Sequence, residues 1–307
     1  YGAAIIARET RGAHPGGVSS FIGFDCLERP VPVRRETLNC RGCENNCRIT
    51  RLRFSGGRSY VTGNRCEQCF SNHGRIGQQG RNLVAAKARI LFERPMAPAG
   101  RPILRFGIPR SLNMYENFPF WCTYLRACGF EVVLSSPSHI ELFEKGVASV
   151  MSDNICFPGK LVHGHIHDLI EKGVDRIFYP NVVYERREQE CACNSYNCPV
   201  VTGYPDVIRS AMNTEGASGI PLDAPAISFK DPRLLERQLA QFVKPFGISR
   251  HKSRRAYAQA LQEQRRFKEQ LRQAAQEIIA QAESCHEPLV VLCGRPYHVD
   301  PLINHGI

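Results

Sequence analysis

The sequence predicts an α/β fold with a parallel, doubly wound sheet, and three observations lead to this class. From residue 101 onward, short apolar runs alternate with longer helix-like stretches, as a parallel sheet with crossover helices requires. Two of the helix-like stretches close on a glycine, at Gly129 and Gly173. The chain has 307 residues, 43% of them hydrophobic, which is enough for about two domains with ordinary cores.

The expected elements of this sheet domain follow in chain order. Short apolar runs predict strands at 103–110, 130–136, 148–152 and 175–183. Longer amphipathic runs predict helices at 113–129, 138–146 and 159–173. Residues 232–284 are expected to be largely helical, with a break near "KPFGIS" and one long helix after it. In such a sheet, ligands bind at the carboxyl ends of the strands.

Composition changes along the chain divide it into five expected segments. These are the last helix of a preceding domain with a linker (1–25), a Cys-rich metal-binding module (26–98), the α/β domain (99–225), a helical segment (226–285), and a strand and turn that rejoin the sheet or open a second α/β domain (286–307). The Cys-rich module shows little apolar periodicity, so a bound metal would replace a core there. We expect the chain to be a piece of a longer polypeptide that is inactive alone.

Charge and hydropathy exclude several classes of protein. The net charge of +11 permits an anionic partner, but the aromatic residues are not interleaved with the basic runs, so nucleic acid is not an expected partner. No apolar run approaches the roughly 18 residues that a membrane span needs, and no signal peptide is recognisable. Fourteen cysteines without an export signal indicate reduced thiols and a cytoplasmic location. No phosphate-binding loop is present, so ATP hydrolysis by this chain is not expected.

The strongest motif is the cluster of Cys40, Cys43, Cys47, Cys66 and Cys69. Two C-x2-C pairs with 22 residues between them suit a tetrahedral zinc site. Three cysteines of the first stretch with one of the later pair suit a [4Fe–4S] cluster equally well. The pattern therefore predicts a metal site without choosing between zinc and iron–sulfur.

A second group of cysteines is spread along the α/β domain. Cys156 falls between an expected strand and a helix, Cys198 follows a strand by a loop, and Cys293 lies near the end of its own predicted strand. A helix N-terminus favours a thiolate, and a parallel sheet would bring Cys156 and Cys198 to one crevice. Cys191 and Cys193 could compete as ligands. Cys26, Cys122, Cys128 and Cys285 are expected to be plain small hydrophobic residues.

Several polar residues lie beside these cysteines and could bind an anionic or carbonyl group. They are Lys160, Arg295, Tyr297 and His298, although each taken singly fits a salt-bridged structural role better. His163, His165 and His167 lack the zinc-protease pattern. On a helix expected to be half exposed, a solvated or supporting role is predicted for them.

Five blocks carry a resemblance to a known family: "CRGCENNC…GNRCE", "IPRSLNMYENFPFW", "SDNICFPGKLVHGHIHDLIEKGVDRIFYP", "YNCPVVTGYP" and "GRPYHVDPLINHGI". The chain resembles the fused proteins known as CoA-substrate-specific enzyme activases, which are related to the 2-hydroxyacyl-CoA dehydratase system of anaerobes. The resemblance implies a flavodoxin-like domain that holds an iron–sulfur cluster, with Cys156 and Cys198 matching cluster cysteines and Cys40, Cys43, Cys47 and Cys66 matching the Cys-rich block.

The resemblance also implies partners and an activity. An ATPase activator on the same polypeptide, whose tail residues 1–25 resemble, would pass a low-potential electron to a dehydratase-like part, with acyl-CoA as a possible ligand. The expected function is thus electron transfer or radical dehydration at a [4Fe–4S]-type cluster, supported by Lys160. The alternative is a zinc-stabilised scaffold, without chemistry of its own, that docks an ATPase to a dehydratase.

Overall fold

The computed structural model describes residues 2–13, 32–41, 46–55, 57–65, 69–70, 82–98 and 100–304. The chain divides into two compact units, and each is described by itself. Unit 1 comprises residues 1–40 and 47–75, and unit 2 comprises residues 41–46 and 76–307. No helix in the described part of the chain is long and apolar enough to cross a membrane.

Unit 1 contains a helix and a small antiparallel sheet. The elements are α1 (Gly2–Ala13), β1 (Val33–Asn39), β2 (Arg48–Phe54) and β3 (Ser59–Thr62), with the strands in the order β1-β2-β3. The sequence analysis missed these strands because their exposed faces carry arginines, which leaves few apolar residues to reveal the alternation. A small core of Cys40, Cys47, Ile49 and Val61 lies against the sheet.

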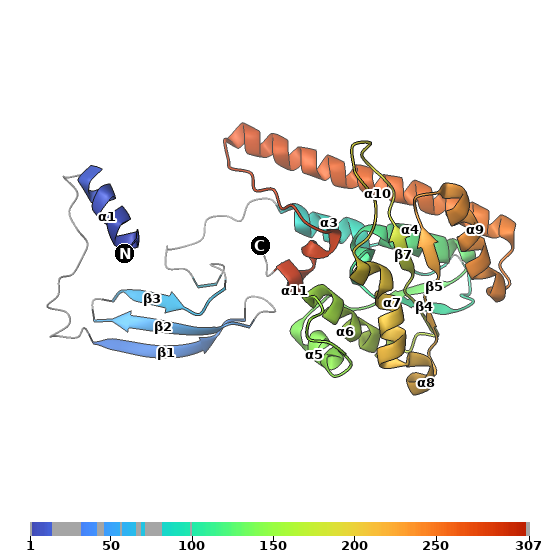
Figure 1. Ribbon diagram of the computed structural model, residues 1–307, viewed down its shortest axis with the longest axis horizontal. Helices are drawn as coiled ribbons and strands as arrows, with labels where there is room; N and C mark the ends of the chain where they lie inside the picture. Colours follow the sequence, from blue (N-terminus) through green and yellow to red (C-terminus); the bar gives the residue numbers. More distant parts are fainter. Residues whose placement is uncertain are drawn as a thin grey trace. The chain divides into compact units, whose positions relative to one another are not determined.

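Unit 2 is mixed α/β and is built on a parallel sheet, as predicted (Figure 1). The sheet contains β4 (Arg105–Ile108), β5 (Glu131–Leu134), β6 (Arg176–Phe178) and β8 (Leu222–Asp223), in the order β5-β4-β6-β8. From β4 the chain passes to one neighbour and then returns to pair β6 on the other side, so the order has a switch point between β4 and β6.

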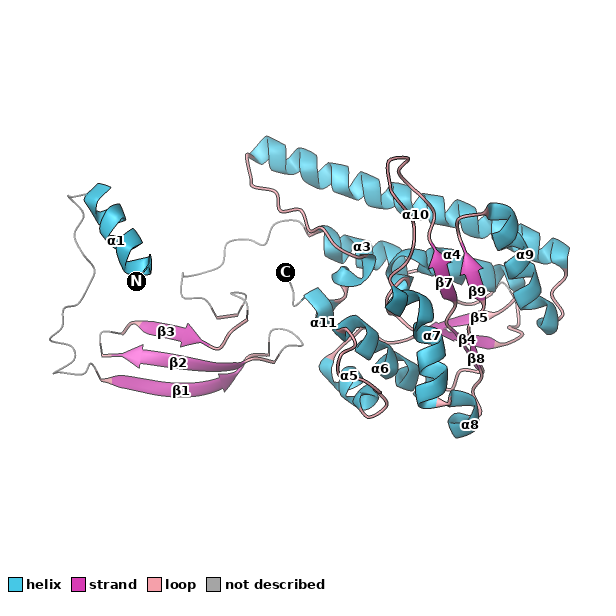
Figure 2. Cartoon of the chain, in the orientation of Figure 1, coloured by secondary structure: helices cyan, strands magenta, loops and turns pink. Residues whose placement is uncertain are grey.

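Two of the strand predictions differ from the structure. The expected strand 175–183 divides at Pro180 into β6 and β7 (Asn181–Tyr184), and β7 pairs with β9 (Ala226–Ser228) in a separate parallel sheet (Figure 2). Proline has no N–H for a strand ladder, which accounts for the break. The expected strand 148–152 does not form, because these residues make the turn and loop that follow α5.

Helices connect and cover the strands. They are α3 (Leu83–Phe92), α4 (Met114–Cys128), α5 (Ile140–Val147), α6 (Phe157–Glu171), α7 (Pro199–Met212), α8 (Thr214–Ser218), α9 (Pro232–Val243), α10 (Arg250–Cys285) and α11 (Pro301–Asn304), with 3-10 turns η1 (Lys244–Phe246) and η2 (Pro296–Val299). The predicted long helix is α10, which begins at the Ser249 cap, and the predicted break before it is η1 and Gly247. Gly129 ends α4 with φ of 102°, a conformation that suits glycine.

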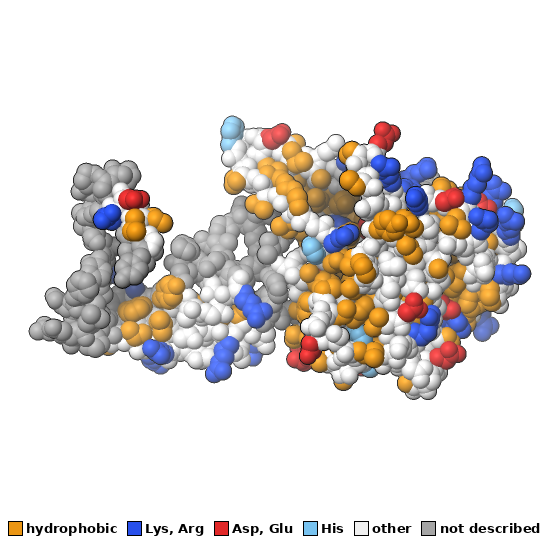
Figure 3. All heavy atoms as spheres, in the orientation of Figure 1, with side chains coloured by type: hydrophobic (Ala, Val, Ile, Leu, Met, Phe, Trp, Pro, Cys, Tyr) orange, Lys and Arg blue, Asp and Glu red, His pale blue; other side chains and the backbone are white. Residues whose placement is uncertain are grey.

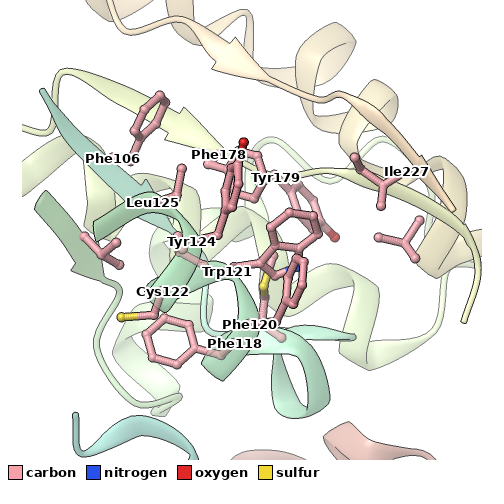
Figure 4. Packing of buried hydrophobic residues seen from close by; sticks show 14 of the residues in the cluster. Phe106, Phe118, Phe120, Trp121, Cys122, Tyr124, Leu125, Phe178, Tyr179 and Ile227 are labelled. Atoms are coloured by element: carbon pink, nitrogen blue, oxygen red, sulfur yellow. The ribbon is translucent and has the colours of Figure 1, made fainter. Parts of the chain in front are cut away.

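The two faces of β4 pack differently. Phe106 packs against Phe130 and Phe246, at ring-centroid distances of 5.0 and 5.6 Å, on the face covered by the aromatic core. Trp121 of α4 extends this core, lying 4.9 Å from Phe178 (Figure 4). Gly107 faces the other way, where a Cβ would be only 3.0 Å from Leu169 of α6. The sheet is therefore covered on both faces, as a parallel sheet requires.

One side chain of the long helix α10 completes the backbone hydrogen bonding of α4. Pro119 interrupts the hydrogen bonding of α4, and the buried Gln264 of α10 lies beside it. The Gln264 amide accepts the N–H of Phe120 at 3.2 Å and donates to the carbonyl of Glu116 at 2.9 Å. Gln264 thus satisfies the two backbone groups that would normally bond to each other in the helix.

After α10 the chain runs in an extended conformation without pairing to a sheet. Leu289, Val290, Val291 and Leu292 are exposed by 43, 80, 72 and 56%, and Figure 3 shows hydrophobic side chains on the surface beside this end of α10. The strand predicted within 286–307 is thus not formed between residues 286 and 304. The chain then returns to unit 2 through η2 and α11.

Candidate cysteine site at the carboxyl edge of the sheet

Cys156 and Cys198 occupy equivalent positions at the starts of two helices. Each is the N-cap residue, Cys156 of α6 and Cys198 of α7, and each has extended backbone angles. Neither thiol makes a capping hydrogen bond, so both remain available at the positive end of a helix dipole. Cys156 is exposed and Cys198 is half-buried.

The first turns of these two helices are packed together. A Cβ on Gly159 of α6 would lie 3.2 Å from Val200 of α7 and 3.4 Å from the ring of Tyr204. Because Gly159 follows Cys156 by three residues and Val200 follows Cys198 by two, both thiols lie at the same end of the helix pair. A larger residue than glycine would push the two turns apart.

Tyr297 of η2 interacts electrostatically with both cysteines. Burial raises the pKa of the Tyr297 hydroxyl, and the charges of Cys198 and Cys156 raise it further, while Arg295 lowers it. Tyr297 of η2 is therefore within electrostatic range of both cysteines. Sequence analysis placed Tyr297 beside a cysteine only through Cys293, which lies in the exposed stretch before η2.

A buried histidine, His163, forms a hydrogen bond with Tyr204 beside this pair of helices. Tyr204 has its pKa raised to about 12 by burial and by the charge of Cys156. The Tyr204 hydroxyl lies 3.1 Å from Nε2 of His163, whose Nδ1 lies 2.8 Å from the Ser149 hydroxyl. Burial lowers the pKa of His163 to about 4, so the ring is neutral at pH 7.

The prediction of a half-exposed histidine helix is wrong for two of its three histidines. His163 and His165 are fully buried, whereas His167 is half-buried. Nδ1 of His165 lies 2.9 Å from the hydroxyl of Ser135, and Nε2 lies 3.1 Å from that of Ser138. Sequence periodicity could not show this, because the side of α6 that was expected to face solvent is covered by α5. The two helices cross closely at Gly146 and Gly164.

The other residues named from the sequence lie at various places in unit 2. Lys160 is half-buried on the first turn of α6, four residues after Cys156. Cys191 and Cys193 are exposed in the loop that leads to Cys198. Cys122 and Cys128 are core residues, as predicted, whereas Cys285 is exposed at the end of α10. Cys26 lies outside the described residues.

Asp300 attaches the segment that carries Tyr297. Its buried carboxylate accepts hydrogen bonds from the Tyr115 hydroxyl at 2.5 Å and from the Ser138 hydroxyl. Its second oxygen accepts the N–H groups of Leu302 and Ile303, at 2.9 and 3.3 Å. The link to Ser138 and Tyr115 could not be predicted, because these partners are 162 and 185 residues away along the chain.

In unit 1, sheet pairing brings the two halves of the first cysteine group to one end. The N–H of Cys40, just after β1, donates to the carbonyl of Cys47, just before β2, at 2.8 Å. Thr62 at the end of β3 pairs with Thr50 near the start of β2, so the chain leaves β3 at this same end. Phe70 packs onto the cluster that contains Cys40 and Cys47. Cys43 and Cys66 lie outside the described residues.

Among the described residues, no three His, Cys, Asp or Glu side chains are grouped so as to hold a metal ion. What the fold and the site define is an α/β protein with two cysteines at helix N-termini on the carboxyl edge of a parallel sheet. The model of the family described as CoA enzyme activase uncharacterised domain (DUF2229) matches residues 105–307. The chain belongs to this family, which supports the resemblance stated from the sequence. No curated protein and no solved structure matches the chain.

Proposed function

We propose that this chain is the iron–sulfur module of a 2-hydroxyacyl-CoA dehydratase/activase-type system, used for low-potential electron transfer or radical dehydration. Cys156 and Cys198 would be ligands of a [4Fe–4S]-type cluster. The supporting observation is that both are N-cap residues of helices whose first turns pack together at Gly159 and Val200. Helix N-termini favour thiolates and anionic groups, and Lys160 adds a positive charge on the same helix.

The residues suit a cluster in charge and position but not in number. A [4Fe–4S] cluster takes four thiolates, or three with one open iron, and the described residues bring two together here. The remaining ligands would come from Cys191 and Cys193, after movement of their loop, or from another polypeptide.

Partners follow from the same proposal. The family description names a CoA enzyme activase, and the electron would come from an ATPase activator and pass to a dehydratase-like part, with acyl-CoA as substrate. These are the partners that we propose for the longer polypeptide.

The second candidate is a zinc-stabilised scaffold that docks such partners without chemistry of its own. Its supporting observation is in unit 1, where Cys40, Cys47 and the end of β3 lie at one end of the sheet. Thiolates brought to one end of a small sheet with few apolar residues suit a structural zinc site.

Metal analysis of anaerobically purified protein separates the two candidates. The proposed module contains iron and acid-labile sulfide and shows the broad visible absorption of iron–sulfur clusters. Replacing Cys156 or Cys198 by Ser should remove most of the iron assigned to unit 2, whereas Cys285→Ser, a change at an exposed thiol elsewhere, should leave it unchanged. Stoichiometric zinc without iron, lost in a Cys40→Ser/Cys47→Ser variant, would establish the scaffold instead.

A further inference from the structure

Buried polar residues follow β4 and β6, on either side of the switch point of the sheet. In the described part of the chain, seven buried side-chain nitrogen or oxygen atoms lack a hydrogen bond of ordinary geometry, and five of them belong to Arg110, Ser111, Asn113 and Tyr179 in the loops after these strands. Ser111 and Tyr179 interact with each other, and the Arg110 guanidinium lies 4.0 Å over the Phe92 ring, whereas the Asn113 amide has no partner. Leaving a buried amide unpaired costs free energy, so its position requires a reason. The carboxyl edge between β4 and β6 is where ligands of this sheet topology bind.

Asn113 is the most informative of these residues. It is 5% exposed, and neither its amide nitrogen nor its amide oxygen has a partner. An asparagine at an N-cap usually accepts a backbone N–H of the first helical turn, but this side chain does not. The N–H groups of Met114 and Tyr115 bond instead to carbonyls of the preceding turn, at Ser111 and Leu112. The amide is thus free of any structural task in the helix.

Asn113 lines a cavity of about 370 Å³. The lining also includes Asn197 just before α7, Val201 in its first turn, and Tyr297 of η2. This volume lies within the usual range for small-molecule sites. The cavity adjoins the cysteine site, because Asn197, which lines it, directly precedes Cys198.

Three glutamates and three arginines line the cavity, and the two sets differ in how their members are paired. Glu116 and Glu188 both pair with Lys268, at 3.9 Å in the case of Glu116. Glu185 accepts hydrogen bonds from Asn117 and Asn197, and burial raises its pKa.

The arginines that line the cavity form fewer interactions with side chains than the glutamates do. The Arg187 guanidinium donates to the backbone carbonyls of Gln189 and Glu190. Arg186 and Arg295 also line the cavity, and neither forms an ion pair with any residue that the structure describes. Two uncompensated guanidinium groups therefore stand at a cavity that also contains an unpaired amide.

We propose that this cavity binds a small organic anion, whose acidic group is held by Arg186 and Arg295 and whose polar oxygen bonds to the Asn113 amide. Guanidinium groups bind carboxylate and phosphate through paired N–H donors. Tyr297 also lines this site. This site does not depend on a cluster being bound, so it can be tested separately from the proposed function.

The test measures thermal stability and calorimetric binding with two probes, succinate and inorganic phosphate, each against sodium chloride at equal ionic strength. The wild-type chain should be stabilised by at least one probe, and the responding probe identifies a carboxylate or a phosphoryl ligand. Arg186→Gln, Arg295→Gln and Asn113→Leu should each weaken binding by at least about tenfold, which is the usual worth of a hydrogen bond to a charged group. Arg209→Gln, which changes an arginine on α7 that is paired with Asp206, is the matched control.

The Asn113→Leu variant also separates a ligand-binding role from a structural one. Because the amide has no partner in the free protein, leucine of similar size should leave the melting temperature of the free protein unchanged or raise it. A lower melting temperature would show that the amide is needed for the fold and would overturn its assignment to a ligand. Equal responses of wild type and Asn113→Leu to the probes, or no response to either, would also overturn the proposal.

Discussion

The attachment of the Tyr297 segment by Asp300 gives the sharpest prediction about stability. In Asp300→Asn, an NH2 group replaces one carboxylate oxygen and must face one of the two pairs of donors, either Tyr115 with Ser138 or the backbone N–H groups of Leu302 and Ile303. Two hydrogen bonds to a charged group are lost. At about 1.5 kcal/mol each, the free energy of unfolding should fall by about 3 kcal/mol.

Urea unfolding followed by circular dichroism measures this change, and Asp153→Asn at an exposed site is the control with the same change of charge. Alkylation of Cys198 gives a local reading, since release of the segment should uncover this thiol and increase its rate of labelling. If Asp300→Asn and Asp153→Asn unfold at the same urea concentration and label at the same rate, the carboxylate does not hold the segment.

The sign of the pH dependence follows from burial. Burial outweighs the four hydrogen bonds and raises the pKa of Asp300 above its ordinary value. The folded protein therefore holds this proton at pH values where the unfolded chain has lost it, so stability falls as pH rises from the ordinary pKa to the raised one. The advantage of wild type over Asp300→Asn should accordingly be largest at the acidic end of that window and should narrow as pH increases.

Two further predictions concern the helix pair that carries the cysteine site. Gly164→Ala should destabilise unit 2 by about 3 kcal/mol in urea unfolding. Its Cβ would lie 2.1 Å from the Leu142 carbonyl, so α5 and α6 would have to separate. Gly203→Ala, in α7 with open space around it, should be neutral or stabilising by up to about 1 kcal/mol, and equal losses in both would contradict the argument. Burial lowers the pKa of His163 to about 4 and of His165 to about 3, so stability should fall as pH drops from about 6.5 towards 4. In the His163→Gln/His165→Gln variant, stability should decline less steeply over that range. A slope equal to that of the wild type would refute the assignment of this pH dependence to the two histidines.

The sequence was sufficient for the main elements of unit 2. The runs that became β4, α4, β5, α6 and α10 are long or apolar enough to fix their type, and their starts and stops carry ordinary cap residues. The parallel arrangement followed from their alternation. Sequence reasoning failed where tertiary context decides, as at Pro180, where one apolar run feeds two sheets, and at 289–292, where a run typical of a strand stays unpaired.

The cysteine site was predictable only in part. The place of Cys156 at the start of a helix was readable, because the run that became α6 is clear in the sequence, whereas the strand expected just before it does not form. Tyr204, Asn113 and Asp300 were not, since nothing local distinguishes a tyrosine, asparagine or aspartate that meets its neighbours only after folding. The buried state of His163 was likewise hidden, because the helix that covers it is held close by a pair of glycines.

The proline that follows Cys198 bears on how a ligand would be taken up. The ring of Pro199 excludes the helical conformation for the residue before it, so the extended angles of Cys198 are set by the covalent chain itself. A sulfur whose backbone is already immobilised loses little freedom when an ion or molecule arrives. Loading at this position should consequently be limited by access and by the supply of further donors, and little by reorganisation of the polypeptide.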